Sequence, residues 1–395
     1  MGLEQKQQTV IELCQRLIRA QSYSGEEKQV ADELAGFMRG QGFDEVTINE
    51  HGCVIGCVHG NRPGPKLLFD GHIDTVPVND ASQWTYPPFA AQIQNDRIYG
   101  RGASDMKGAV AAMACAIANY AKETGRDFAG SLYLAGVVHE ECFEGVAARA
   151  ISAAVKPDYV IIGEASELDI KIGQRGRGEI RLEVFGKAAH SANPEKGINS
   201  VYHIMRVIER IRQLLPGEHP VLGKGILELT DIKSSPYPGA SVVPSYCAAT
   251  YDRRLLVGET KESVLALLQA LLDDMMAQDS ELNAKISLVR GEERCYTGAA
   301  IAAERFFPGW LFDEQEPFVQ SVMGKMNEAG FKPQIRQYNF CTNGSHYAGE
   351  AGIRTIGCGP SSEGLAHTRD EYIELEQLFG AVGCYEAIIA GLLAV

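Results

Sequence analysis

Carboxylates and histidines follow three apolar runs of the sequence. Residues 67–69, 134–138 and 160–162 are apolar and short enough to be buried strands. Within a few residues, each run is followed by side chains that can bind a metal ion or move a proton. Because the carboxyl ends of parallel strands share one crevice, we expect these side chains to lie close together. They are His72, Asp74, Glu140, Glu141 and Glu164.

Two more residues belong to the same predicted crevice. Asp105 follows a glycine-rich turn and opens the next predicted helix, so its carboxylate faces the same edge. His367 lies in a loop beyond a predicted strand at residues 354–358. So many carboxylates would repel one another unless cations compensated them. Mixed imidazole and carboxylate ligands suit zinc, cobalt or manganese, so the sequence predicts a metal centre.

The number of candidate ligands favours two divalent ions. One Asp, two Glu and two His supply a bridging carboxylate and terminal ligands for each ion. Asp74 is two residues beyond His72, where it can accept the second imidazole N–H and orient the ring. Glu140 is left without a ligand role and is expected to be the general base for a water held by the metals. The predicted ligands are His72, Asp105, Glu141, Glu164 and His367.

Each of these residues also has an ordinary explanation. Asp105 could cap a helix, and His72 could be a core histidine with satisfied hydrogen bonds. Glu140 and Glu141 could form a solvated strand end. Their joint occurrence at successive strand ends favours the metal centre.

The elements around these residues predict one α/β domain interrupted by an insert. Two helices open the chain, the second starting at a capping box of Ser24 and Glu27. Strands and helices then alternate up to residue 162, as in βαβ units. Residues 176–290 contain two helices and several antiparallel strands, and the first pattern then returns.

We therefore predict a catalytic domain of residues 1–175 and 291–395 with a mainly parallel mixed sheet flanked by helices. Residues 176–290 are predicted to form an α+β lid or dimerisation domain, with residues 173–178 as its hinge.

Composition narrows the class of protein further. The chain has 395 residues, is 45% hydrophobic and carries a net charge of −14, without a run of five basic residues. These values argue against a disordered chain and against a nucleic-acid partner.

The apolar stretch 381–395 is interrupted by Glu386 and is expected to be a buried helix too short for a bilayer. The N-terminus shows no signal-peptide core. We expect a cytoplasmic protein without a membrane partner, whose ten cysteines are buried reduced thiols.

Four segments closely resemble the di-zinc amidohydrolases of the acetylornithine deacetylase, succinyl-diaminopimelate desuccinylase, aminoacylase and carboxypeptidase G family. The segments are residues 72–77, 100–108, 139–141 and 163–164. The resemblance covers nearly the whole chain. The chain is also similar to a bacterial branch of the family described as selenium-metabolism-linked hydrolases.

The resemblance implies a role for each predicted ligand. The bridging Asp of the family falls on Asp105. His72 and Glu164 would bind one zinc ion, and Glu141 and His367 would bind the other. The first Glu of the Glu-Glu pair, Glu140, would be the general base.

The resemblance also gives the inserted domain a role. In the family, a histidine of this domain reaches the active site of the partner subunit, and the segment 186–191 places it at His190. The family's carboxylate-binding arginine falls on Arg254, although its neighbour Arg253 would face the opposite way along a strand. Asn343 lies in a turn-forming segment and is a second candidate substrate contact.

These residues together predict hydrolysis of an amide bond next to a free carboxylate. The expected substrate is an N-acyl amino acid or a small peptide, and the expected assembly is a homodimer through the inserted domain. A di- or tripeptidase or carboxypeptidase on the same scaffold is the first alternative. A non-catalytic binding protein is disfavoured, because neither the ligands nor the base is missing.

Overall fold

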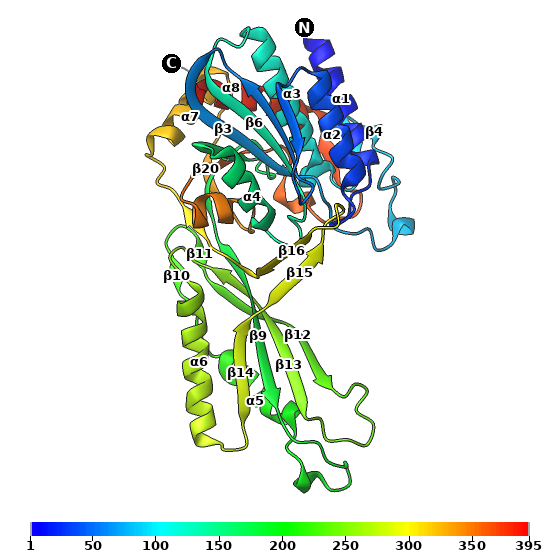
Figure 1. The fold of residues 1–395 in the computed structure, drawn as a ribbon, viewed down its shortest axis with the longest axis vertical. Helices are drawn as coiled ribbons and strands as arrows, with labels where there is room; N and C mark the ends of the chain where they lie inside the picture. Colours follow the sequence, from blue (N-terminus) through cyan, green and yellow to red (C-terminus); the bar gives the residue numbers. More distant parts are fainter. Residues whose placement is uncertain (1, 394–395) are drawn as a thin grey trace. The chain divides into compact units, whose positions relative to one another are not determined.

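The computed structural model describes residues 2–393, which form two compact units (Figure 1). The large unit comprises residues 2–174, 292–302 and 311–393. The small unit comprises residues 175–291 and 303–310. The chain therefore leaves the large unit and returns to it twice.

The large unit is built on a nine-stranded mixed sheet, which confirms the expected α/β class. Its central strands run parallel, because β3 pairs in parallel with β6 and β7, and β7 pairs in parallel with β20. The antiparallel pairings lie toward the edges. The strands are β1 (Glu45–Ile48), β2 (Val54–His59), β6 (Ala129–Val137), β3 (Arg62–His72), β7 (Tyr159–Ile162), β20 (Arg354–Gly357), β8 (Ile170–Gln174), β18 (Trp310–Leu311) and β19 (Ile335–Tyr338).

Helices pack against this sheet. α3 and α8 contact each other and β3, α1 packs on α3, α7 packs on α8, α2 packs on β1 and β2, and α4 packs on β6. Their bounds are α1 (Leu3–Arg19), α2 (Lys28–Gly40), α3 (Gly108–Glu123), α4 (Val146–Val155), α7 (Pro317–Glu328) and α8 (Leu375–Leu393). A small three-stranded sheet adds β4 (Gln92–Gln94), β5 (Arg97–Tyr99) and β21 (Tyr372–Glu374), and a separate pair is formed by β15 (Arg290–Arg294) and β16 (Ala300–Glu304).

Helix α8 differs in length from the expectation. It begins at Leu375, and by length and composition alone it is long enough to cross a membrane, so the prediction that it is too short was wrong. However, Leu378, Tyr385 and Ile388 are fully buried, and the helix contacts α3, α7 and β3. It is therefore a core helix of the large unit. The last two residues of the predicted apolar stretch, 394–395, lie outside the described residues.

The small unit is an antiparallel sheet covered by two helices. The strand order is β12 (Ile226–Ser235), β13 (Tyr246–Leu255), β9 (Gly176–Phe185) and β14 (Asn283–Leu288), with β17 (Phe306–Phe307) also pairing with β9 and a short pair β10 (Glu218–His219) and β11 (Gly223–Lys224) apart from it. Alternate residues of β9, such as Ile180 and Leu182, share one apolar core with residues of α5 (Ser200–Ile211) and α6 (Lys261–Gln278). This alternation is what a sheet with one covered face requires.

All ten cysteines are free thiols, and all except the half-buried Cys142 are buried. Burial raises the pKa of Cys14 and of Cys53 to about 12. These two thiols therefore stay protonated near neutral pH, which fits the expected structural role.

Candidate metal centre

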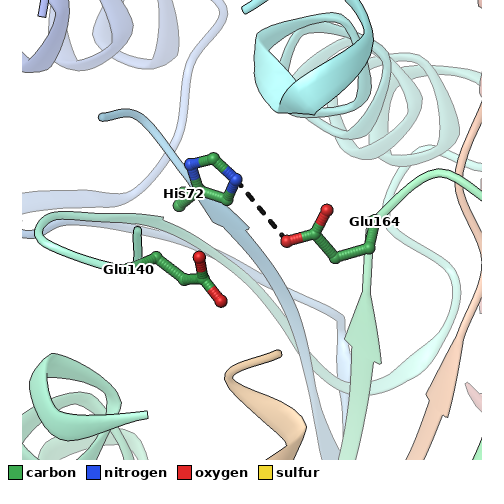
Figure 2. Close-up of side chains that lie close together, drawn as sticks. All are labelled: His72, Glu140 and Glu164. Carbon is green, nitrogen blue, oxygen red and sulfur yellow. Dashed lines mark ion pairs between the residues drawn. The ribbon is translucent and has the colours of Figure 1, made fainter. Parts of the chain in front are cut away.

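Three strand ends of the large unit bring the predicted residues together. His72 is the last residue of β3, Glu140 and Glu141 follow β6, and Glu164 follows β7. Because β3 pairs in parallel with both neighbours, all three strands end at one edge of the sheet. Figure 2 shows the side chains of His72, Glu140 and Glu164 gathered there.

Asp105 lies between two histidines. His72 Nε2 is 2.8 Å from Asp105 Oδ1, and His367 Nε2 is 3.3 Å from Asp105 Oδ2. Each carboxylate oxygen thus faces a different imidazole. His72 Nε2 is also 3.5 Å from Glu164 Oε1, and His367 Nε2 is 3.0 Å from Glu141 Oε2. All five predicted ligands therefore lie together, in two groups that meet at Asp105.

The acidic side chains of this cluster are largely shielded from solvent. Burial raises the pKa of Glu164 well above its usual value, and the nearby charge of Asp105 raises it further. Hydrogen bonds that the His367 imidazolium donates to the carboxylates of Asp105 and Glu141 raise the pKa of His367 to about 10 despite its partial burial. The carboxylates thus stabilise positive charge strongly at this place. Two divalent ions would provide such charge.

The donor atoms fit such ions. His72, Glu140 and Glu164 offer one group of ligand atoms within 4.8 Å of one another, and His72, Asp105 and Glu141 offer a second. Glu140 is only 6% exposed, and its Oε1 atom is buried without a hydrogen-bond partner among the described residues. An unpaired buried carboxylate oxygen is costly, so this atom is expected to face a cation or a bound water.

Asp74 contacts His72 mainly through its backbone. His72 Nδ1 lies 2.8 Å from the backbone oxygen of Asp74 but 3.6 Å from the carboxylate. The carboxylate instead accepts the backbone N–H groups of Glu140, at 3.1 Å, and of Glu141, at 3.2 Å. Asp74 thereby holds the loop that carries both glutamates.

Ser24 and Glu27 belong to this network and do not cap a helix. Helix α2 begins at Lys28 without a side-chain cap, so the predicted capping box was wrong. Ser24 Oγ donates to Asp74 Oδ2 at 2.7 Å, and Glu27 Oε1 accepts the N–H of Gly25 at 2.9 Å. The hydrogen-bond partner of Ser24 is thus not a helix N–H but a carboxylate 50 residues away in the sequence.

Glu371 is a further buried acid of the site and is not among the predicted residues. Its Oε1 accepts the backbone N–H of Ser104 at 2.9 Å and of Asp105 at 3.1 Å, and its Oε2 pairs with Arg101 at 2.6 Å. Burial raises its pKa to about 7. Glu371 thus fixes the backbone that carries Asp105. Its position four residues after His367 is the only signal in the sequence.

Asn343 is placed differently from the expected substrate contact. It is 3% exposed, its Nδ2 donates to Asp70 at 2.9 Å, and its Oδ1 accepts the N–H of Gly145 at 2.7 Å. Tyr347 donates to the other oxygen of Asp70 at 2.8 Å. Asn343 is therefore part of a buried polar network, which indicates a structural role.

The two remaining candidates belong to the small unit. His190 is exposed, and its Nδ1 accepts the N–H of Ala192 at 3.0 Å, which leaves Nε2 for another group. Arg254 is partly exposed and pairs with Asp252 at 2.7 Å. Its neighbour Arg253 is 5% exposed and is held by Glu259. Of the two arginines, Arg254 is the one accessible to a ligand.

Comparison with known proteins identifies the family. Residues 68–391 match the model of peptidase family M20/M25/M40. The uncharacterized protein YgeY of Escherichia coli K12 is 31% identical, over 94% of this chain and 91% of its own. Succinyl-diaminopimelate desuccinylase 2 of Ruegeria sp. TM1040 is 32% identical, over 96% of this chain and 94% of its own.

A solved structure has the same fold. The Bacillus subtilis protein YXEP, a dinuclear metal binding peptidase of family M20, matches with a TM-score of 0.69 at 13% identity, over 98% of this chain and 99% of its own. The chain belongs to the M20/M25/M40 peptidase family. It is accordingly a metal-binding hydrolase that acts on amide bonds.

Proposed function

We propose that this protein uses two divalent metal ions to hydrolyse the amide bond of an N-acyl amino acid or small peptide with a free carboxylate. The observation that carries the proposal is the position of Asp105, whose two oxygens face His72 and His367 separately. Zinc is favoured over cobalt and manganese, and His72, Asp105, Glu141, Glu164 and His367 would be the ligands. When bound, the ions polarise the scissile carbonyl and lower the pKa of the attacking water.

Glu140 is proposed as the general base. It takes a proton from the attacking water and returns it to the nitrogen of the leaving amine. Its buried Oε1 has no protein partner in the described chain, so this oxygen is available for that proton. Asp74 holds the backbone of Glu140 and keeps the carboxylate directed into the crevice. Asp74 therefore acts as a positioning residue for the base.

The small unit is proposed to bind the other end of the substrate. Arg254 would hold the free carboxylate of the substrate by paired hydrogen bonds. His190, supplied by the partner subunit of a homodimer, would donate to the oxyanion that forms at the scissile carbon. His190 is exposed and only its Nδ1 accepts the N–H of Ala192, which supports this role.

An apolar surface of the small unit supports the homodimer. Tyr202 and Met205 on α5 are 68% and 57% exposed, and Ile232 on β12 is 48% exposed. β12 is also an edge strand, whose free backbone groups can pair with another chain. Exposed apolar side chains and a free strand edge are each typical of a surface that a partner covers.

The cytoplasm is the proposed location. Ten free cysteines, nine of them buried, fit a reducing compartment. A secreted chain of this size would be expected to use some of its cysteines in disulfide bonds.

A substrate panel and two variants test the proposed function. Zinc-reconstituted protein should bind two ions per chain and hydrolyse at least one of a set of N-acetyl, N-formyl and N-succinyl amino acids and dipeptides. E140A should keep both ions but lose on the order of a hundredfold or more in kcat, whereas E141A should lose metal. A protein that binds no zinc after reconstitution contradicts the proposal. Loss of metal in E140A together with an active E141A would reverse the two roles.

The panel also separates the alternatives. Faster turnover of dipeptides or tripeptides than of every N-acyl amino acid would make the protein a peptidase. This outcome would leave the metal ligands and the base as proposed.

A further inference from the structure

An open cavity of about 400 Å³ lies beside the metal centre, within the large unit. The loop after β3, residues 76–84, lines one side of it, and His367 and Arg369 line another. Because His367 is a proposed metal ligand, a group that fills the cavity lies against the metal centre. The mechanism proposed above makes no use of this space.

Arg369 provides a positive charge in the cavity. Its side chain is exposed, and its Nη1 donates to Gln83 Oε1 at 2.6 Å. Across residues 2–393, no carboxylate oxygen lies within the 4 Å of its guanidinium that would make an ion pair. The guanidinium is therefore oriented by a neutral oxygen and keeps its charge for another partner.

The acid of the cavity, Asp80, is engaged elsewhere. Its Oδ1 accepts the N–H of Ser82 at 3.0 Å and the hydroxyl of Ser82 at 2.6 Å, and its Oδ2 accepts from Gln83 Nε2 at 2.8 Å. Gln83 is thereby turned so that its amide nitrogen faces Asp80 and its oxygen faces Arg369. This arrangement holds Arg369 in place without neutralising it at contact distance.

The second cation of the cavity, Arg101, is already paired. It is 5% exposed, bonds Glu371 and lies 5.3 Å from the centre of the Trp84 ring. The cavity therefore combines one aromatic side chain with one cation, Arg369, that forms no ion pair at contact distance, although its charge acts on the nearby Asp80 and Asp370. A carboxylate on a short carbon chain fits this pair of groups, because the guanidinium binds the acid and the ring contacts the methylenes.

We propose that this cavity is a subsite for an acidic arm of the substrate, and that Arg369 selects substrates carrying a carboxylate there. This inference rests on the proposed amide hydrolysis. The arm would be either the distal carboxylate of a dicarboxylic acyl group or the acidic side chain of the amino acid. In both cases, the carboxylate accepts two N–H bonds from one guanidinium.

Two matched substrate pairs test the subsite. N-succinyl-alanine is compared with its terminal amide, N-succinamoyl-alanine, and N-acetyl-glutamate is compared with N-acetyl-glutamine. The wild type should prefer the acid of at least one pair by on the order of tenfold or more in kcat/KM. In R369Q this ratio should fall to about one, and R369K should retain part of it because it keeps the charge but not the paired donors.

The matched control is R62Q, which removes an exposed arginine at the start of β3. R62Q should keep the wild-type ratio. If R369Q keeps the ratio as well, or if the wild type shows no preference in either pair, the subsite is disproved while the proposed function stands. If none of the four compounds nor any member of the wider panel is hydrolysed by the zinc-loaded enzyme, the proposed function itself fails.

Binding can be followed without turnover. The sequence has only two tryptophans, and one of them, Trp84, lines the cavity. Succinate should change the tryptophan fluorescence of the zinc-loaded protein, and succinamide should not. The change should disappear in W84F and weaken on the order of tenfold in apparent affinity in R369Q. An equal response of wild type and R369Q to succinate would overturn the inference.

Discussion

At the scale of single residues, the hydroxyl of Ser24 fixes the carboxylate of Asp74, which in turn fixes the loop that carries Glu140 and Glu141. Ser24 donates to Asp74, and Asp74 holds the backbone of Glu140 and Glu141. S24A should therefore lower kcat by about threefold to tenfold while KM changes little, because the base loses position and the substrate contacts remain. Steady-state kinetics would show this. S280A, in an exposed turn of the small unit, is the control and should leave kcat and the melting temperature unchanged. A drop in KM alone for S24A would contradict the prediction.

A second prediction at this scale concerns acid stability. Glu350 is partly buried, which raises its pKa, but hydrogen bonds from His346 and Arg149 outweigh this and lower its pKa from 4.5 to about 2. A depressed carboxyl pKa stabilises the fold above pH 4.5, and this contribution is lost as the pH falls toward 2. The difference in unfolding free energy between wild type and E350Q should thus be larger at pH 7 than at pH 3, as measured by urea unfolding. A difference that stays constant between these pH values would refute the assignment. E376Q, at an exposed site of α8, is the matched control.

The residue scale also shows what the sequence could reveal. That the five proposed ligands lie together was predictable, because three of them end or follow parallel strands that stop at one edge of the sheet. Ser24 and Glu371 were not, since each acts through a contact with a residue 50 or more positions away that no local pattern marks. The burial of Asn343 was not predictable, because a turn signal does not tell whether the turn is buried.

At the scale of elements, the position of α1 depends on one buried amine. Lys107 is fully buried, and its Nζ donates to the backbone oxygens of Leu17 and Ala20, at 2.9 Å and 2.8 Å, where α1 ends. K107M would leave both carbonyls without this donor and should lower the free energy of unfolding by about 1–3 kcal/mol. K122M, on the exposed side of the neighbouring α3, should change it by less than about 0.5 kcal/mol. Chemical denaturation measures both, and equal effects would disprove the role of Lys107.

The bounds of the elements were predictable where the pattern had clear ends. Helix α6 is one of the two helices predicted within residues 176–290, and its start carries a capping box of Thr260 and Ser263. The final helix was less well predicted because β21 precedes it and pairs with β5, a strand far away in the sequence. Long-range pairing of this kind leaves no periodic signal.

At the scale of the whole molecule, the proposed homodimer makes a quantitative prediction. If each site takes His190 from the partner, then H190A and E140A are each inactive for different reasons. Mixing them with free subunit exchange should restore about one quarter of wild-type activity, because half of the dimers are mixed and each mixed dimer has one complete site. Subunit exchange can be verified by mass spectrometry of tagged chains. If exchange occurs but activity does not recover, His190 acts in its own chain or not at all.

The order of strands in the large sheet determines how late in synthesis the sheet can be completed. β20 lies between β7 and β8, although about 190 residues separate it from β7 in the chain. At roughly 5–20 residues per second, a ribosome needs about 10–40 s to add this stretch. During that interval β7 has an unpaired, apolar edge in the centre of the future sheet. A nascent chain stalled before residue 354 should therefore be a good chaperone client, and release of the chaperone should coincide with the arrival of β20.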